Sequence, residues 1–250
     1  MTPMLFALNI WYARSTLDYI TTTMRHIQKP TSQDEPESFS RWKRGHPHAK
    51  YSSFHNVRAK TALKQALMKR QKYICCYCES RISAETSHIE HIEPQHGGLS
   101  QKTLEFSNMA ISCIKDPKKY EQQDDRSGIG VLRDGWLHCG HARGTLPVAS
   151  PYDPICDRLF LYSFSGEIKV NPKLTDKKEI KLAKETIANL RLNVPPLVNL
   201  RRLAMFETVK LIEKGVPANV ILKEINGRLP PFISSAETAT LAMSKRKNQK

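Results

Sequence analysis

The sequence predicts an α+β protein with a small cysteine-rich centre between an N-terminal helical segment and a largely helical C-terminal region. Five of the six cysteines fall between Cys75 and Cys139, and a short stretch with β-strand character lies among them at residues 88–94. Amphipathic helical patterns stand on both sides of this centre. A length of 250 residues, with 40% hydrophobic and 25% charged residues, suits one compact domain or two small ones.

Net charge indicates the class of partner. The chain carries 39 Lys and Arg against 24 Asp and Glu, a net charge of +15. Residues 1–70 and 146–250 each carry a net +8, whereas residues 71–145 carry −1. A neutral centre between basic flanks is typical of a chemical site between phosphate-binding surfaces, although a basic surface that only improves solubility gives the same total. The sequence has no run of about 18 apolar residues that could cross a membrane, and its apolar opening is a poor candidate for a signal peptide. We therefore expect a cytoplasmic protein.

The cysteines predict a structural zinc site. A cytosolic protein keeps its thiols reduced, so clustered cysteines indicate metal binding rather than disulfides. A C-x-x-C pair allows a tight turn to bring two thiolates to one zinc ion, and two further thiols close a tetrahedral site. The predicted ligands are Cys75, Cys78, Cys113 and Cys139. The alternatives are small buried hydrophobic residues or a redox pair. Cys76 and Cys156 are expected to be buried thiols outside the site.

The segment between the second and third of these ligands carries the predicted chemistry. Adjacent side chains of a β-strand point to opposite faces, so Glu90 can bind a metal ion while His91 meets the substrate. The Glu90 carboxylate is a hard ligand suited to Mg²⁺ or Mn²⁺, and a neutral His91 can accept a proton from an attacking water. Alternatively, His88 and Glu90 form a ligand pair on one face and His91 points into the core. Two further histidines, His96 and His138, are expected to be loop residues. Those of the basic lead-in, His46, His48 and His55, are expected to be exposed or hydrogen-bonded rather than functional.

The motifs between residues 72 and 145 resemble those of HNH endonucleases, which have the ββα-metal fold. The motifs are C-x-x-C, Glu90-His91-Ile92-Glu93-Pro94, Gly97-Gly98, Asn108, Cys113 and Cys139-Gly140-His141-Ala142-Arg143-Gly144. More narrowly, they resemble the PtuB-like HNH proteins of Septu and retron anti-phage systems. The resemblance implies a zinc-stabilised ββα-metal core and metal-dependent hydrolysis of phosphodiester bonds, with DNA favoured over RNA.

The resemblance also implies a role for each matched residue. Glu90 takes the place of a metal ligand that is usually Asp, and His91 takes that of the general base. Asn108 matches the middle Asn, which fixes the loop and orients the base through a backbone contact. His141 matches the final His or Asn and would be the second ligand of the catalytic Mg²⁺ or Mn²⁺, unless His88 has that role.

The sequence departs from the common HNH pattern at two places. The second zinc pair is usually a C-x-x-C, whereas here 25 residues separate Cys113 from Cys139. In addition, Gly140 stands between Cys139 and His141. Two residues further on, Arg143 is expected either to contact a non-bridging phosphate oxygen or to be an exposed helix charge.

The expected partners follow from the resemblance and from one missing motif. The sequence has no phosphate-binding Gly-Lys-Ser/Thr loop, so ATP hydrolysis requires another chain. The resemblance implies a PtuA-like ATPase subunit and, in a retron, the reverse transcriptase and its RNA–DNA hybrid. We therefore expect the nuclease effector of a Septu- or retron-type defence system. The alternative is a non-catalytic, zinc-stabilised nucleic-acid-binding or structural subunit of such a complex.

The patterns divide the chain into four parts. Residues 1–38 are expected to form an N-terminal extension and a polar linker, and the resemblance implies that residues 1–23 lie upstream of the usual start. Residues 39–71 form a basic lead-in and an amphipathic helix. Residues 72–146 form the HNH core, with an insertion at 114–138, and residues 147–250 form a β-hairpin and a helical region.

The last part has the clearest secondary-structure patterns. They predict a hairpin at 159–170, helices at 176–192, 196–214 and 218–226, and a solvated basic tail at 244–250. The second of these helices is expected to bury an apolar stripe. Its members are Leu200, Leu203, Phe206, Val209 and Leu211.

Overall fold

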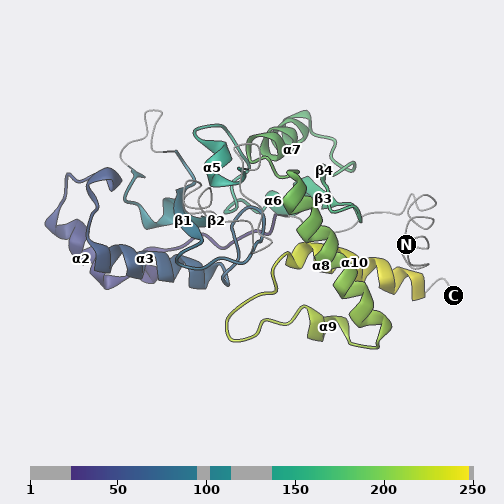
Figure 1. Cartoon of the computed structure of the whole chain (residues 1–250). Coiled ribbons are helices and arrows are strands. Elements are labelled where there is room, and N and C mark those ends of the chain that lie inside the picture. Colours follow the sequence, from purple (N-terminus) through teal and green to yellow (C-terminus); the bar gives the residue numbers. More distant parts are fainter. Residues whose placement is uncertain (1–23, 95–101, 114–136, 248–250) are drawn as a thin grey trace, which may run out of the picture.

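The computed structural model describes residues 24–94, 102–113 and 137–247 (Figure 1). Within these ranges the protein is a mixed α/β structure with two antiparallel sheets of two strands each, set among helices. The predicted extension at 1–23 and nearly all of the predicted insertion at 114–138 lie outside the described residues. Among the described helices, none has the length and apolar character needed to cross a membrane.

The N-terminal part consists of two packed helices. A single 3₁₀ turn, η1 (Ser32–Asp34), precedes α2 (Glu37–Gly45), so the predicted polar linker is partly ordered. α2 packs against α3 (Val57–Arg70), and the Phe39 ring lies 5.1 Å from the Phe54 ring between them. These aromatic contacts fix the lead-in segment beside the central sheet.

α3 follows the predicted amphipathic pattern. The Asn56 side chain accepts a hydrogen bond from the Ala59 backbone N–H, which satisfies one free donor at the helix start. The buried residues of its inner face include Ala59, Leu63 and Leu67, at the predicted spacing of four. The helix ends directly before residues 72–82, which contain the C-x-x-C pair and are called the cysteine turn below, so the packing of the helix determines where this turn begins.

The central sheet pairs β1 (Ser87–His91) with β2 (Met109–Cys113). The strands are antiparallel, with Glu90 opposite Ala110 and Ser87 opposite Cys113. A 3₁₀ turn, η4 (Phe106–Asn108), leads into β2. The sheet therefore places the Glu-His step at one end and a cysteine at the other end of the same pair of strands.

Gln71 joins α3, the cysteine turn and β2. Its side chain is 4% exposed, donates hydrogen bonds to Ile74 O (3.0 Å) and Ile111 O (2.8 Å), and accepts one from Ile111 N (2.6 Å). Buried backbone polar groups need such partners. A single buried amide thus satisfies groups from two segments.

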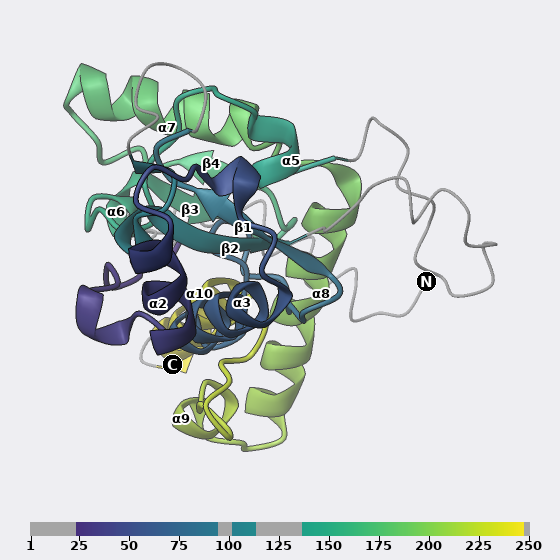
Figure 2. The same cartoon turned by 90° about the vertical axis from the view of Figure 1, so that its left-hand side faces the viewer.

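The C-terminal part contains the predicted hairpin and helices (Figure 2). Its elements are α5 (Gly140–Arg143), α6 (Cys156–Leu159), β3 (Phe160–Tyr162), β4 (Ile168–Val170), α7 (Lys177–Asn189), α8 (Pro195–Glu213), α9 (Ala218–Ile221) and α10 (Ile233–Lys247). The hairpin and the first two long helices confirm the prediction. Gly166 in the hairpin turn has a φ of +90°, and a Cβ there would lie 2.0 Å from Val198 O of α8, so only glycine fits this contact.

One prediction for this part is wrong. The helix expected at 218–226 stops at Ile221, because residues 225–228 form a tight turn with an antiparallel bridge between Ile225 and Arg228. The basic tail expected at 244–250 is helical as far as Lys247, since α10 extends into it, and Ser244 and Arg246 are exposed to solvent as expected.

The predicted apolar stripe of α8 is correct only in part. Val209 is buried and Phe206 is half-buried, but Leu200, Leu203 and Leu211 are 43%, 44% and 38% exposed, and Arg201 is fully buried. The Arg201 guanidinium donates to Leu192 O (2.8 Å) and Gly166 O (3.3 Å) and lies 5.2 Å from the Tyr162 ring. These carbonyls come together only in the folded chain. Their hydrogen bonds to Arg201 therefore place a partly different face of α8 in the interior from the one that the sequence pattern predicts.

The cysteine turn also anchors the last helix. The buried Glu79 carboxylate accepts hydrogen bonds from Ser234 N (2.9 Å) and Ser234 Oγ (2.6 Å) at the start of α10, and Phe232 N donates to Glu79 O (2.9 Å). α10 packs in turn against α8 (Figure 1). One continuous cluster of buried apolar side chains joins the N-terminal helices, the centre and the C-terminal part.

We predict that Gln71→Leu lowers the free energy of unfolding by about 2–4 kcal/mol, because it leaves buried backbone groups of Ile74 and Ile111 without partners. The matched control is Gln65→Leu on the exposed face of α3, which should stay within about 0.5 kcal/mol of the wild type. Urea denaturation of the metal-loaded protein measures both. Equal effects of the two substitutions would contradict the bridging role of Gln71.

Candidate functional site

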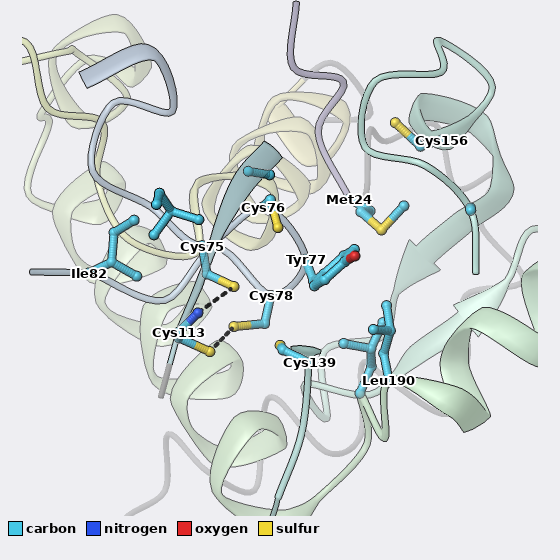
Figure 3. Close-up of a cluster of buried hydrophobic side chains, with 14 of the residues drawn as sticks. Met24, Cys75, Cys76, Tyr77, Cys78, Ile82, Cys113, Cys139, Cys156 and Leu190 are labelled. Carbon is cyan, nitrogen blue, oxygen red and sulfur yellow. Dashed lines mark hydrogen bonds between the residues drawn. The ribbon is translucent and has the colours of Figure 1, made fainter. Parts of the chain in front are cut away.

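The four predicted cysteine ligands come together in one buried cluster (Figure 3). The Sγ atoms of Cys75, Cys78, Cys113 and Cys139 all lie within 4.8 Å of one another. A tetrahedral zinc with bonds of 2.3 Å to sulfur separates its ligands by about 3.8 Å. The distance from Cys78 Sγ to Cys113 Sγ is 3.6 Å. The cluster therefore fits one metal ion with four thiolates, and the long separation of Cys113 from Cys139 does not prevent convergence.

Three separate segments deliver these sulfur atoms. The tight turn of the C-x-x-C pair is closed by hydrogen bonds from Cys75 N to Ser80 O (2.9 Å) and from Glu79 N to Cys75 O (3.1 Å). Cys113 ends β2, and its backbone N–H donates to Cys75 Sγ (3.3 Å). Cys139 precedes α5 with a φ of +57°, an uncommon conformation for a residue other than glycine. A bound ion would thus join the turn, the sheet and α5.

The four thiols differ in how readily they ionise. Burial opposes ionisation, but hydrogen bonds from Cys113 and Cys139 lower the pKa of Cys78 to about 6 and that of Cys75 well below its usual value. The pKa values of Cys113 and Cys139 themselves are raised well above the usual value. His138 Nδ1 lies 3.1 Å from Cys139 Sγ and 3.7 Å from Cys113 Sγ. His138 is in a loop, as predicted, and it is also a buried neighbour of the four cysteines, which the sequence did not indicate. Such neighbours orient the ligands of a metal.

Cys76 and Cys156 lie outside this cluster, as predicted (Figure 3). Both are buried, and burial raises the pKa of each thiol well above its usual value. They therefore remain protonated and behave as small apolar residues.

A second polar cluster surrounds the Glu90 carboxylate. Glu90 Oε1 accepts hydrogen bonds from Tyr77 Oη (3.1 Å) and Arg143 Nη1 (3.0 Å), and Oε2 lies 3.3 Å from His88 Nε2. The ring of His141 lies 4.4 Å from that of His88. Burial opposes ionisation, but His88 and Arg143 nevertheless lower the pKa of Glu90. An ionised carboxylate therefore stands with two imidazoles between β1 and α5.

Gly140 makes this approach of α5 to β1 possible. A Cβ at position 140 would lie 2.3 Å from Glu90 Oε2 and 2.6 Å from His88 Nε2. Any other residue would displace those two side chains. Gly140, which departs from the common HNH pattern, therefore leaves the space that the Glu90 and His88 side chains occupy.

His91 lies on the opposite face of β1, as the strand alternation predicts. Its Nε2 is 2.9 Å from Thr103 O, and its ring meets the Tyr51 ring edge-on at 4.6 Å. With the proton assigned to Nε2 by this hydrogen bond, the lone pair is on Nδ1. Burial lowers the pKa of His91, so the ring is neutral at pH 7. A neutral imidazole with a fixed tautomer is suited to accept a proton.

Asn108 closes the loop that carries Thr103. Its Oδ1 accepts a hydrogen bond from Glu93 N (2.7 Å), and its Nδ2 donates to Glu93 O (3.1 Å) and Lys102 O (3.2 Å). These bonds join the residues on either side of the stretch from 94 to 101. Because Lys102 adjoins Thr103, Asn108 acts on the His91 ring only through the backbone.

Arg143 requires a correction. The side chain is buried and is not an exposed helix charge. Besides Glu90, it donates hydrogen bonds to Tyr77 Oη (2.9 Å), His91 O (3.2 Å) and Ile92 O (2.6 Å), and its Nε donates to Leu146 O (3.1 Å). The expected phosphate contact is therefore replaced here by bonds within the protein, since the guanidinium joins α5 to β1.

The structure also supplies partners that the sequence did not reveal. Tyr77 and Tyr51 contact Glu90 and His91 respectively, and the Thr103 carbonyl fixes the His91 ring. Tyr77 lies inside the C-x-x-C pair and Tyr51 in the aromatic lead-in, which are the signals that point to them. A backbone carbonyl such as that of Thr103 has no sequence signal at all.

The choice between His88 and His141 stays open. His88 and Glu90 share one face while His91 faces away, which agrees with the alternative ligand pair. His141 nevertheless lies beside His88, as the HNH resemblance implies. Both imidazoles are thus within the same cluster around Glu90.

Comparison with known proteins supports the resemblance. No family model matches the chain. The retron Vc95 putative HNH endonuclease of Vibrio cholerae serotype O1 biovar El Tor is 29% identical over 163 residues, which cover 64% of this chain and 71% of that protein. The similarity to an HNH endonuclease in a retron context, which the motifs predicted, is confirmed.

We predict that Cys78→Ser abolishes binding of the structural metal, because three thiolates cannot close the tetrahedral site. The wild type should carry about one zinc per chain. Cys76→Ser, a matched change two residues away, should leave the zinc content unaltered. Elemental analysis of the gel-filtered proteins measures this, and retention of zinc by Cys78→Ser would contradict the ligand assignment.

Proposed function

We propose that this protein is a metal-dependent HNH endonuclease that hydrolyses phosphodiester bonds in nucleic acid, with DNA favoured over RNA. The observation that carries the proposal is the arrangement around the Glu90-His91 step. An ionised Glu90 lies with His88 and His141 on one face of β1, and a neutral His91 lies on the other. The order of β1, β2 and α5 around the cysteine cluster supports a ββα-metal core.

The chain's own residues suit the steps of hydrolysis. Glu90 and His141, or Glu90 and His88, would hold a divalent cation, because carboxylate oxygen and imidazole nitrogen are ligands for Mg²⁺ or Mn²⁺. When bound, the ion supplies positive charge that stabilises the transition state at the phosphate. His91 would take a proton from the attacking water at Nδ1, while Thr103 O holds Nε2. Asn108 would keep that carbonyl in place.

The relative's name supports the biological setting of the proposal. That protein is called a retron putative HNH endonuclease. We infer a role as the effector of a retron- or Septu-type defence system, with a PtuA-like ATPase subunit and, in a retron, the reverse transcriptase and its RNA–DNA hybrid as partners. The cysteines, which the described structure leaves unbridged, fit a reducing cytoplasm.

One observation favours a second candidate function. Tyr77, Arg143 and His88 all contact the Glu90 carboxylate, so a cation must compete with an existing ion pair. A carboxylate with these contacts could also serve only to stabilise the fold between β1 and α5. The second candidate is therefore a non-catalytic, zinc-stabilised subunit that binds nucleic acid.

We predict that His91→Ala lowers the rate of plasmid or RNA cleavage in Mg²⁺ or Mn²⁺ by about 10²–10⁴-fold, because the general base is lost. Purified protein is tested with and without its neighbouring ATPase. His55→Ala is the matched control, since His55 is exposed in the lead-in and should cleave like the wild type. All variants are checked for zinc content.

Two outcomes would count against the proposal. If zinc-loaded His91→Ala cleaves as fast as His55→Ala, His91 is not the base. If the wild type cleaves neither polymer even with the ATPase present, the binding subunit becomes the better description.

The pH dependence provides a separate prediction. Burial holds the pKa of His91 below its usual value, so the base is already neutral at pH 7. The cleavage rate should be level around neutral pH and fall about tenfold per pH unit below that pKa, as the ring becomes protonated. Initial rates between pH 5 and 8.5 at saturating metal measure this. A rate that already falls between pH 8 and 7 would contradict the lowered pKa.

A further inference from the structure

A groove lies between the cysteine turn and the segment that joins α9 to α10. It encloses about 740 Å³. Tyr73 and Arg81 contribute from the cysteine turn, and residues 223–230 contribute the other wall. In both views this segment lies well away from α5, so the groove is separate from the Glu90 cluster (Figures 1 and 2).

The outer wall of the groove is rigid. Asn226 and Gly227 have φ angles of +51° and +74°, the conformation of a tight hairpin turn. Ile225 and Arg228 exchange backbone hydrogen bonds of 2.9 and 3.0 Å across the turn. Leu229 N donates to Lys72 O (3.1 Å), which attaches this wall to the cysteine turn. The groove is therefore formed before any ligand binds.

The lining of the groove is positively charged and has no carboxylate. Its cations are Arg81, Lys223 and Arg228. Among the described residues none of the three forms an ion pair, and the neighbouring Glu224 is paired with Lys72 at 3.2 Å. Desolvation and the charge of Arg228 both lower the pKa of Arg81, which means that the two guanidinium groups repel each other. An anion between them would relieve this repulsion.

One aromatic ring and one exposed aliphatic side chain accompany the cations. The Arg228 guanidinium lies 4.4 Å from the centre of the Tyr73 ring, and the adjacent Ile225 is 63% exposed. Arg81 is held in place by hydrogen bonds to the carbonyls of Tyr73 and Leu229. Phosphate-binding cations beside stacking surfaces are typical of sites for single-stranded nucleic acid.

We propose that this groove binds the backbone of a nucleic-acid strand at a distance from the Glu90 cluster. Lys223 and Arg228 contact phosphates at the rim, Arg81 provides positive charge at the floor, and Tyr73 and Ile225 contact bases. The inference extends the proposed function by adding a second contact for the same class of substrate. It does not require that the chain cleaves that substrate.

The test measures binding of a fluorescein-labelled 30-nucleotide single-stranded DNA to the full-length, zinc-loaded protein. All proteins carry His91→Ala so that cleavage does not interfere. Lys223→Gln with Arg228→Gln should weaken binding about tenfold at 0.1 M salt and reduce the slope of log K against log salt by about 1.4, since about 0.7 is lost per phosphate contact with a single strand. A variant with Lys223→Gln and Arg228→Lys should bind the DNA more tightly than the double glutamine variant, because it keeps one of the two positive charges.

The matched control is Lys181→Gln with Lys184→Gln on α7, which removes the same charge from an exposed helix. It should change affinity less than twofold. Equal weakening by both pairs would overturn the groove, because binding would then depend only on net charge. The groove proposal would also be overturned if Lys223→Gln with Arg228→Gln weakened the binding of polyglutamate but left the binding of DNA unchanged. That result would favour an acidic protein partner.

The outcome for the groove is separable from that for the nuclease. If wild type cleaves DNA and the groove variant binds like its control, the groove proposal fails and the proposed function stands. If wild type cleaves nothing and the groove variant alone loses binding, the groove proposal stands and the chain is a binding subunit.

Discussion

Four buried sulfur atoms within reach of one ion are the constraint on which the rest of the centre depends. They belong to a turn, a strand end and the start of a four-residue helix, which lie in separate parts of the sequence. Ionised thiolates at these distances repel one another unless a cation lies between them. A bound metal ion would therefore contribute directly to folding and would hold α5 against β1. The positions of Glu90, His88 and His141 follow from that arrangement.

The pairing of Arg143 with Glu90 gives the site its electrostatic character. A buried carboxylate needs a compensating charge, and Arg143 supplies it while also satisfying the carbonyls of His91 and Ile92. A divalent cation beside Glu90 would add positive charge next to this guanidinium. One carboxylate cannot balance both, and a phosphate anion would reduce the excess positive charge. Metal and nucleic acid would therefore each favour the binding of the other.

The sequence predicted those features that depend on spacing and periodicity. The four cysteine ligands, the opposite faces of Glu90 and His91, the inner face of α3 and the β3–β4 hairpin all follow from such patterns. The burial of Arg143 and Arg201 does not, because each guanidinium donates hydrogen bonds to backbone carbonyls that meet only in the folded chain. The same holds for His138, whose place beside the thiols depends on the convergence of distant segments. The α8 stripe failed in part for this reason too, since Arg201 lies on the buried face of the helix.

Position 140 has a consequence for how such a centre changes over time. Glu90 and Gly140 share one small volume, because the end of the glutamate side chain occupies the space of a Cβ at 140. A shorter acid at position 90 would vacate part of that space, but His88 Nε2 lies 2.6 Å from the same point and would still obstruct a larger residue at position 140. A substitution at one of these places alone leaves a clash or a void. The three positions therefore behave as one unit of variation, and related sequences are expected to exchange them together.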